Sequence, residues 1–250
     1  MTAPPPPPSW LTVFLDFPAA EFDAGVGFWR AGTGYGLSPS RGDAGEFATL
    51  VPPAGDHYLK VQRLGDGPTR LHLDVHVRDP WASAEAAEAA GAELVEESRH
   101  GYVVLRSPAG FTFCLVTHPG VVVPPPLTWP AWEHRSRVSR FCLDVPRKRY
   151  AGEVAFFQRL LGGEWQHVGD PETALRPAGD WALDVRLQPA EVSAETTSHL
   201  HIATDDLEAE VERLSELGAK PRALRTGKAI LEAPGGTALC VVEVEPGDLG

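Results

Sequence analysis

The sequence predicts an α+β protein in which one type of domain occurs twice, and three features support this fold class. The first is a set of similar segments that recur in the same order in both halves of the chain, such as PAGD at 53–56 and again at 177–180. The second is a repeated order of strand patterns and helix patterns within each half. The third is a proline-rich segment between the halves, which is typical of a linker.

Further segments match between the halves. FLDFP at 14–18 matches CLDVP at 142–146, and LHLDV at 71–75 matches LHIAT at 200–204. Each half also ends in a Pro-x-Gly turn followed by a strand that carries a cysteine, at Cys114 and again at Cys240. From these matches we expect four parts, which are a proline-rich leader at 1–8, a domain at 9–118, a linker at 119–135 and a second domain at 136–245.

The elements of the first half follow in order. TVFLDF near the start reads as a strand, and residues 21–32 read as a helix closed by glycines. Residues 57–64 and 71–77 alternate between apolar and polar side chains, as strands with one apolar face do. Residues 79–91 form a second helix pattern, and a hairpin of two strands closes the half at Val116. This order predicts two βαβββ modules in each half.

The second half repeats the order and contains the best-formed helix pattern, at 206–217. Asp205 is expected to cap this helix at its start. Its apolar residues fall on one face, as expected for a helix that packs on a sheet: Leu207, Val211, Leu214 and Leu217. Three glutamates are expected to face water or its border: Glu208, Glu210 and Glu212.

The two halves resemble members of the vicinal oxygen chelate superfamily, which includes glyoxalase I, bleomycin-resistance proteins and extradiol dioxygenases. The resemblance is carried by LHLDVHVRDPWASAEAAEAAGAELV with SPAGFTFCLV, and by LHIATDDLEAEVERLSELGAKP with APGGTALCVV. It implies two tandem glyoxalase-like domains, each with two βαβββ modules that form a cupped mixed sheet with flanking helices. It covers nearly all of the chain outside the leader and linker, and it is specific for the fold rather than for a reaction.

In metal-using members of that superfamily, His or Glu side chains from four strands of the cup hold an ion. Carried over to this sequence, the four positions of the first half are Thr12, Lys60, His72 and Cys114. Those of the second half are Arg140, Asp184, His201 and Cys240. Asp74 and His76 complete the expected ligand-binding residues, because they share a strand face with His72.

A cation stands at one of these positions in each half. The ammonium of Lys60 and the guanidinium of Arg140 offer no metal-binding lone pair and repel an ion, which needs several neutral or anionic donors. We therefore expect no cofactor. The leading hypothesis is a metal-independent binding protein that sequesters a small-molecule ligand in a cavity of each cup, and the two cations favour a ligand with an acidic or electron-rich group.

Two other functions stay open. A divalent-metal-dependent lyase, isomerase or dioxygenase would hold its ion with His72, Asp74 and His76, or with His201 and Asp184. Alternatively, the fold is a non-catalytic interaction scaffold with filled cups. Cys114 and Cys240 are interpreted as packed thiols rather than as nucleophiles, and Cys142 is interpreted as a core residue.

Composition limits the partners. The formal net charge of −12 provides no basic surface for nucleic acid and disfavours an anionic membrane. The first residues lack the pattern of a signal peptide, no apolar stretch approaches the ~20 residues of a membrane span, and three cysteines without a CxxC motif favour reduced thiols. We expect a cytoplasmic protein that is a monomer with pairing between its domains, or a homodimer.

Overall fold

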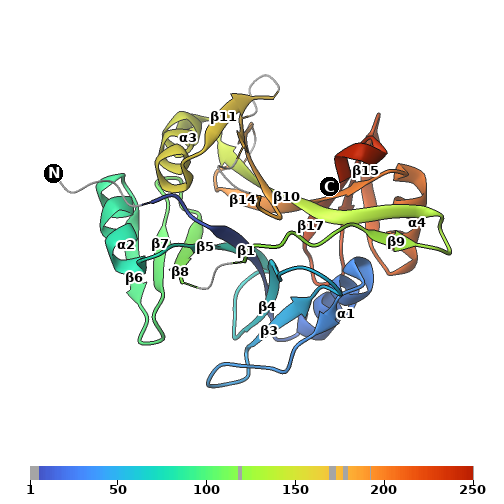
Figure 1. Ribbon diagram of the computed structural model, residues 1–250, viewed down its shortest axis with the longest axis horizontal. Helices are drawn as coiled ribbons and strands as arrows, with labels where there is room; N and C mark the ends of the chain where they lie inside the picture. Colours follow the sequence, from blue (N-terminus) through green and yellow to red (C-terminus); the bar gives the residue numbers. More distant parts are fainter. Residues whose placement is uncertain (1–5, 118–119, 169–172, 177–179, 192, 250) are drawn as a thin grey trace. The chain divides into compact units, whose positions relative to one another are not determined.

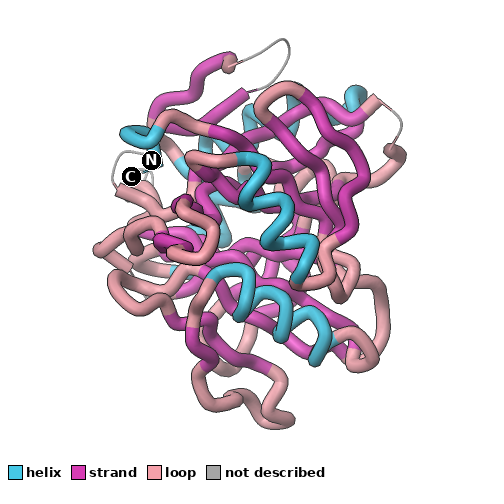
Figure 2. Tube along the Cα trace, turned by 90° about the vertical axis from the view of Figure 1, so that its right-hand side faces the viewer, coloured by secondary structure: helices cyan, strands magenta, loops and turns pink. Residues whose placement is uncertain are grey.

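In the computed structural model of the protein, the residues that the structure describes are 6–117, 120–168, 173–176, 180–191 and 193–249. Most of the predicted leader at 1–8 lies outside them. The described regular structure consists mainly of strands, with few helices (Figure 2). None of the described helices is both long enough and apolar enough to cross a membrane.

The chain forms two compact units that do not coincide with the two sequence copies. Unit 1 contains Met1–Val13, His72–Val122 and Cys142–Ser198, and unit 2 contains Phe14–Leu71, Val123–Phe141 and His199–Gly250. Each unit therefore combines one part of each copy. The limits at 9–118 and 136–245 describe the sequence repeat, and as domain boundaries they stay a prediction.

The first copy forms one mixed sheet of eight strands (Figure 1). The strand order is β2-β3-β4-β1-β5-β8-β7-β6, in which β5 and β8 are parallel. The strands are β1 (Trp10–Pro18), β2 (Gly36–Leu37), β3 (Phe47–Val51), β4 (Leu59–Leu64), β5 (Arg70–His76), β6 (Glu93–Glu97), β7 (Val103–Arg106) and β8 (Thr112–Val116).

The second copy forms a sheet with the same order, β11-β12-β13-β10-β14-β17-β16-β15, and β14 and β17 are again parallel. A ninth strand, β9, pairs with the start of β10, so the predicted linker at 119–135 is partly regular. The strands are β9 (Leu127–Trp129), β10 (His134–Pro146), β11 (Glu164–His167), β12 (Thr173–Arg176), β13 (Asp184–Ala190), β14 (Thr197–Thr204), β15 (Lys220–Arg225), β16 (Lys228–Glu232) and β17 (Ala238–Glu243).

Within the described residues, four α-helices follow the predicted order. They are α1 (Phe22–Thr33), α2 (Pro80–Ala89), α3 (Arg147–Leu161) and α4 (Leu207–Glu216), and a short 3₁₀ helix, η1 (Pro246–Leu249), follows the last strand. Gly34 ends α1 in the left-handed conformation, with φ of 67°, which glycine adopts at little cost. Asp79 caps α2 by accepting bonds from the backbone N–H groups of Trp81 and Ala82.

The predicted cap of α4 is wrong by one residue. Asp206, not Asp205, accepts the bond from the backbone N–H of Ala209. Asp205 instead accepts from the backbone and the guanidinium of Arg135 at the start of β10, at 2.7 and 3.0 Å. A neighbouring arginine from a segment far away in the chain therefore decides which of two adjacent aspartates becomes the cap.

The central strands are buried on both faces. On β1, Leu11, Val13 and Leu15 have exposed fractions of 0–1%, and Thr12 on the opposite face is at 0%. Apolar and polar side chains therefore alternate along the strand as predicted, but the face that carries the polar side chains is buried as well. Polar side chains there must therefore find partners within the protein, because an unpaired buried polar group is costly.

Candidate functional site

The polar face of β5 contains three of the predicted residues, His72, Asp74 and His76. The His72 Nε2 atom lies 3.9 Å from Asp74 Oδ1. His76 Nε2 lies 2.9 Å from the hydroxyl oxygen of Thr12 on β1 and forms a buried hydrogen bond with it. Thr12 therefore points to the same face as the β5 residues.

Cys114 joins two of these residues. It lies directly opposite Asp74 across the parallel β5–β8 pair, so the two side chains share a face. His72, Asp74 and Cys114 each offer one ligand atom, and these atoms lie within 4.8 Å of one another. Imidazole, carboxylate and thiolate are a donor set that suits zinc and similar ions. The group differs from the predicted His72, Asp74 and His76 set, because Cys114 takes the place of His76.

Lys60, the predicted cation of the first copy, lies on β4 and is half-buried. Its Nζ atom is 5.0 Å from the centre of the Phe14 ring, which is a cation–π contact. Phe14 and Thr12 are two residues apart on β1 and share a face, so Lys60 projects to the polar face of this sheet.

Arg140 is the predicted cation of the second copy, and it contacts His201. The Nη1 atom of Arg140 lies 3.1 Å from His201 Nδ1. A guanidinium can only donate, so Nδ1 of His201 is the acceptor and its proton resides on Nε2. That Nε2–H donates to His199 Nε2 at 3.0 Å, and the two rings stack with centres 5.0 Å apart. Both nitrogens of His201 are therefore engaged.

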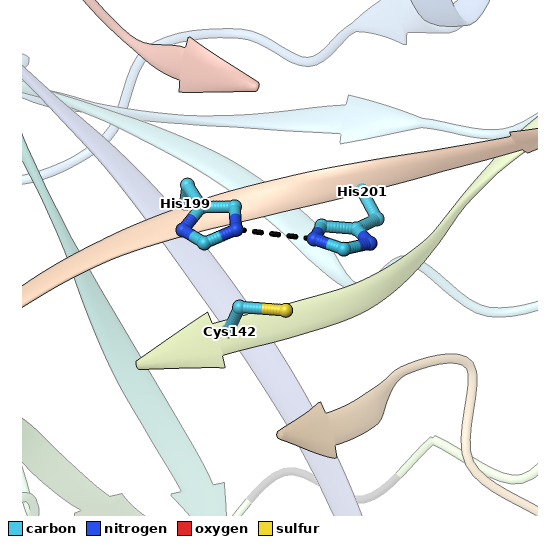
Figure 3. Close-up of side chains that lie close together, drawn as sticks. All are labelled: Cys142, His199 and His201. Atoms are coloured by element: carbon cyan, nitrogen blue, oxygen red, sulfur yellow. Dashed lines mark hydrogen bonds between the residues drawn. The ribbon is translucent and has the colours of Figure 1, made fainter. Parts of the chain in front are cut away.

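His199 and His201 form a pair of neighbouring imidazoles on β14 (Thr197–Thr204). Figure 3 shows the two rings, with the His199–His201 hydrogen bond dashed. Both residues are buried. Two imidazoles would suit an ion such as zinc, but in this arrangement the Arg140 guanidinium occupies one lone pair of His201.

The remaining predicted residues lie at two different places. Cys240 is opposite His201 across the parallel β14–β17 pair and is buried at 4% exposure. Asp184 begins β13 and is exposed. In the part of the chain that the structure describes, neither belongs to a group of three potential ligands.

The predicted site residues did not include His199. The signal for it is strand alternation, because His199 and His201 stand two residues apart on β14 and share a face.

The glyoxalase-like domain family matches the chain over residues 12–116 and 140–242. These two segments agree with the two sequence copies. Among curated protein sequences, none matches the chain.

Solved structures share the fold at low sequence identity. The Mn(II)-bound glyoxalase from Novosphingobium aromaticivorans is 20% identical with a TM-score of 0.63, over 95% of this chain and 82% of that chain. The 2,3-dioxygenase LapB from Pseudomonas sp. KL28 is 14% identical with a TM-score of 0.63, over 98% and 94%. A xylose isomerase-like TIM barrel/4-hydroxyphenylpyruvate dioxygenase fusion protein is 16% identical with a TM-score of 0.60; 96% of this chain aligns, but it spans only 50% of that protein.

Proposed function

The chain belongs to the glyoxalase-like domain family, and from that premise we propose that it binds a small organic molecule on its cupped sheets without a metal ion. The supporting observation is the contact between Arg140 and His201. A guanidinium remains charged at every relevant pH, so this side chain holds a lone pair of His201 and repels a divalent ion at the same time. The resemblance to metal-using relatives implies an ion ligand at position 140, and this chain has a cation there.

The metal content of the purified protein tests this proposal. In protein prepared without chelator, elemental analysis is expected to find manganese, iron, nickel and zinc far below one equivalent. Arg140→Ala is expected to increase the affinity for zinc, because it frees His201 Nδ1 beside His199. Arg30→Ala removes an exposed arginine on α1 and serves as the matched control, which should leave zinc affinity unchanged.

Two results would contradict the proposal. One is wild-type protein that retains nearly one equivalent of a transition metal. The other is an Arg140→Ala variant that binds zinc no better than wild type, which would show that the guanidinium does not exclude the ion. Binding itself is tested by titration with the neutral aromatic probe 2-naphthamide, for which saturable binding is expected.

A second function, a divalent-metal enzyme, is favoured by one observation in the first copy. His72, Asp74 and Cys114 would hold the ion, and they offer neutral and anionic donors at mutual distances that suit one. A bound divalent ion supplies Lewis-acid polarisation of a substrate oxygen. This function predicts that His72→Ala loses a metal equivalent that wild type carries, whereas His100→Ala, which removes an exposed histidine, retains it.

A further inference from the structure

The first sheet carries a cluster of cations and aromatic rings that contains none of the potential metal ligands His72, Asp74 and Cys114. It consists of Arg41, Phe47, Thr49 and Lys60, together with Phe14 of β1, and all five belong to unit 2. We propose that this cluster, called here the anion subsite, binds the carboxylate of an aromatic acid; the proposal rests on the small-molecule function above and specifies its ligand class.

The register of β3 and β4 places the polar groups of the subsite together. Thr49 is directly opposite Lys60 in this antiparallel pair, so the two side chains lie on the same face. Arg41 reaches the same point, because its Nη2 atom donates to the Thr49 hydroxyl oxygen at 2.8 Å. The guanidinium of Arg41 therefore contacts Thr49, and the Lys60 side chain leaves the same face of the sheet directly opposite.

The backbone holds Arg41 in place. Its N–H and C=O pair with those of Phe47, at 2.8 and 3.0 Å, and this closes a narrow loop at the start of β3. In the part of the chain that the structure describes, no carboxylate forms an ion pair with Arg41. Its one side-chain partner there is the neutral hydroxyl of Thr49, so its charge is left for another anion.

Thr49 has a further hydrogen-bonding capacity. Its hydroxyl accepts from Arg41, and within the described chain it donates to no acceptor. The residue is 2% exposed, so this donor is also removed from water. A buried donor without an acceptor is costly, and a ligand oxygen would satisfy it.

Two rings form an apolar surface beside these donors. Phe14 and Phe47 meet edge to face, with ring centres 5.9 Å apart at 75°, and Lys60 Nζ lies 5.0 Å from the Phe14 centre. Arg41 is exposed, and Phe47 and Lys60 are half-buried, so the subsite is reached from solvent. Rings next to a guanidinium and an ammonium suit a flat aromatic ligand with a carboxylate, which accepts from the Arg fork in a bidentate manner.

The nearby ionisable groups carry both signs, with Arg41 and Lys60 as cations and Asp43, Glu46 and Asp56 as acidic residues. His57 lies near both cations: burial lowers its pKa, and the charges of Lys60 and Arg41 lower it further, while Asp56 acts in the opposite direction. The carboxylate of Glu46 is used within the loop, where it accepts from the backbone N–H of Ala44.

A matched pair of probes tests the subsite, because 2-naphthoate and 2-naphthamide differ mainly in charge. By calorimetric titration of the full chain, 2-naphthoate is expected to bind about tenfold more tightly than the amide. Arg41→Gln and Lys60→Gln are each expected to remove most of this preference, and added salt is expected to reduce it in wild type. Arg63→Gln is the control, since Arg63 lies on β4 and its guanidinium covers the Phe22 ring, 5.2 Å from the ring centre.

The outcomes separate the two proposals. If both probes bind equally to wild type, or if Arg41→Gln and Lys60→Gln retain the preference for naphthoate, the anion subsite is wrong and small-molecule binding survives. If neither probe binds to wild type, both proposals fail. A preference that Arg63→Gln loses to the same extent would show a general charge effect, and it would also overturn the subsite.

Discussion

Two glutamates with the same burial behave in opposite ways in the two units. Glu153 on α3 in unit 1 and Glu210 on α4 in unit 2 are both 0% exposed. Burial raises the pKa of Glu153, and its bonds to Ser107 and Ala109 together with the charge of Arg149 only partly offset this, so the pKa stays above its ordinary value. Burial also acts to raise the pKa of Glu210, but its bonds to Arg213 and His134 outweigh burial and hold the pKa below its ordinary value.

The partners explain the difference. Glu153 accepts a short hydrogen bond from the Ser107 hydroxyl and one of 2.8 Å from the backbone N–H of Ala109, so these donors are neutral, and Arg149 acts on it only through its charge. Glu210 accepts from Arg213 Nε, Ser136 Oγ and His134 Nε2, at 2.7, 3.0 and 2.7 Å. A buried carboxylate is held ionised by nearby cations, and burial alone favours its protonated form.

His134 carries a charge in this network. Its Nε2 faces the Glu210 carboxylate, and its Nδ1 faces the carbonyl oxygen of Trp132 at 3.3 Å. Both partners are acceptors, so both ring nitrogens donate and the ring is an imidazolium. Burial acts to lower its pKa, but the bond to Glu210 outweighs this and the pKa is raised. Arg213 also donates to the carbonyl of Gly32 at 2.8 Å and covers the Trp129 ring, so the network ties α4 to α1 and β9.

The largest expected effect is the loss of the Glu210 charge. Glu210→Gln leaves the buried guanidinium of Arg213 and the imidazolium of His134 without their anion. We expect the free energy of unfolding to fall by about 3–5 kcal/mol, measured by urea denaturation.

Glu208→Gln is the control for this change, because Glu208 is exposed on the same helix and should change stability by less than ~0.5 kcal/mol. A loss below ~1 kcal/mol in Glu210→Gln would mean that the network does not stabilise unit 2. The difference in pKa between Glu210 and Glu153 would then have no matching difference in stability.

The turns that precede β8 and β17 give a second contrast between the units. A threonine hydroxyl donates to each turn, Thr196 to the carbonyl of Ala109 at 2.7 Å and Thr69 to that of Gly235 at 2.5 Å. In unit 1 Glu153 binds the turn through polar contacts. In the repeat, Gly25 of unit 2 stands at the position that corresponds to Glu153. The backbone of Gly25 lies against the turn, because a Cβ added to Gly235 would be 2.8 Å from Gly25 Cα. One unit therefore uses a carboxylate where the other uses close backbone contact.

The second prediction concerns this glycine. In Gly25→Ala the new Cβ would lie 2.5 Å from the Phe17 ring, closer than carbon atoms approach. We expect a loss of about 1–3 kcal/mol in the free energy of unfolding, measured by urea denaturation.

Two further variants sharpen the interpretation. Phe17→Val, the residue type that the second copy has at Val145, should restore part of the stability in the double variant. Gly27→Ala in the same helix, where no atom lies within 4 Å of an added Cβ, should instead stabilise by about 0.5–1 kcal/mol. Equal effects of the two alanine variants would refute the close-contact explanation.

The smallest effect concerns Glu153 and depends on pH. Its folded pKa is raised, so its contribution to stability is fully present below its ordinary value of 4.5 and is lost as pH rises through the folded pKa. Glu153→Gln should therefore flatten the decline of stability above pH 4.5, measured by urea denaturation at a series of pH values. Glu164→Gln, at an exposed strand residue, is the control and should leave the fall of stability with pH as in wild type. If Glu153→Gln also leaves this fall unchanged, the raised pKa of Glu153 does not affect stability and its difference from Glu210 is refuted.

Several parts of the fold could be predicted from local patterns. The order of strands and helices follows from apolar periodicities of about two and 3.6 residues, which are visible within short segments. Alternation also predicts which face of the first sheet Thr12 and Lys60 occupy. The helix pattern placed Glu210 at the border of water, and this was wrong: the side chain is buried because Arg213, His134 and Ser136 surround it.

The sequence by itself determined the repeat, the family resemblance and the residue types that stand at each position of the two polar faces. Only the tertiary structure decided the partners: that Arg140 holds His201, that Cys114 rather than His76 joins His72 and Asp74, and that Glu153 lies under a turn from the other copy. The physical reason is that a periodicity fixes the direction of a side chain relative to its own backbone. Its electrostatic environment comes from residues tens of positions away, and that environment sets which protons and charges it carries.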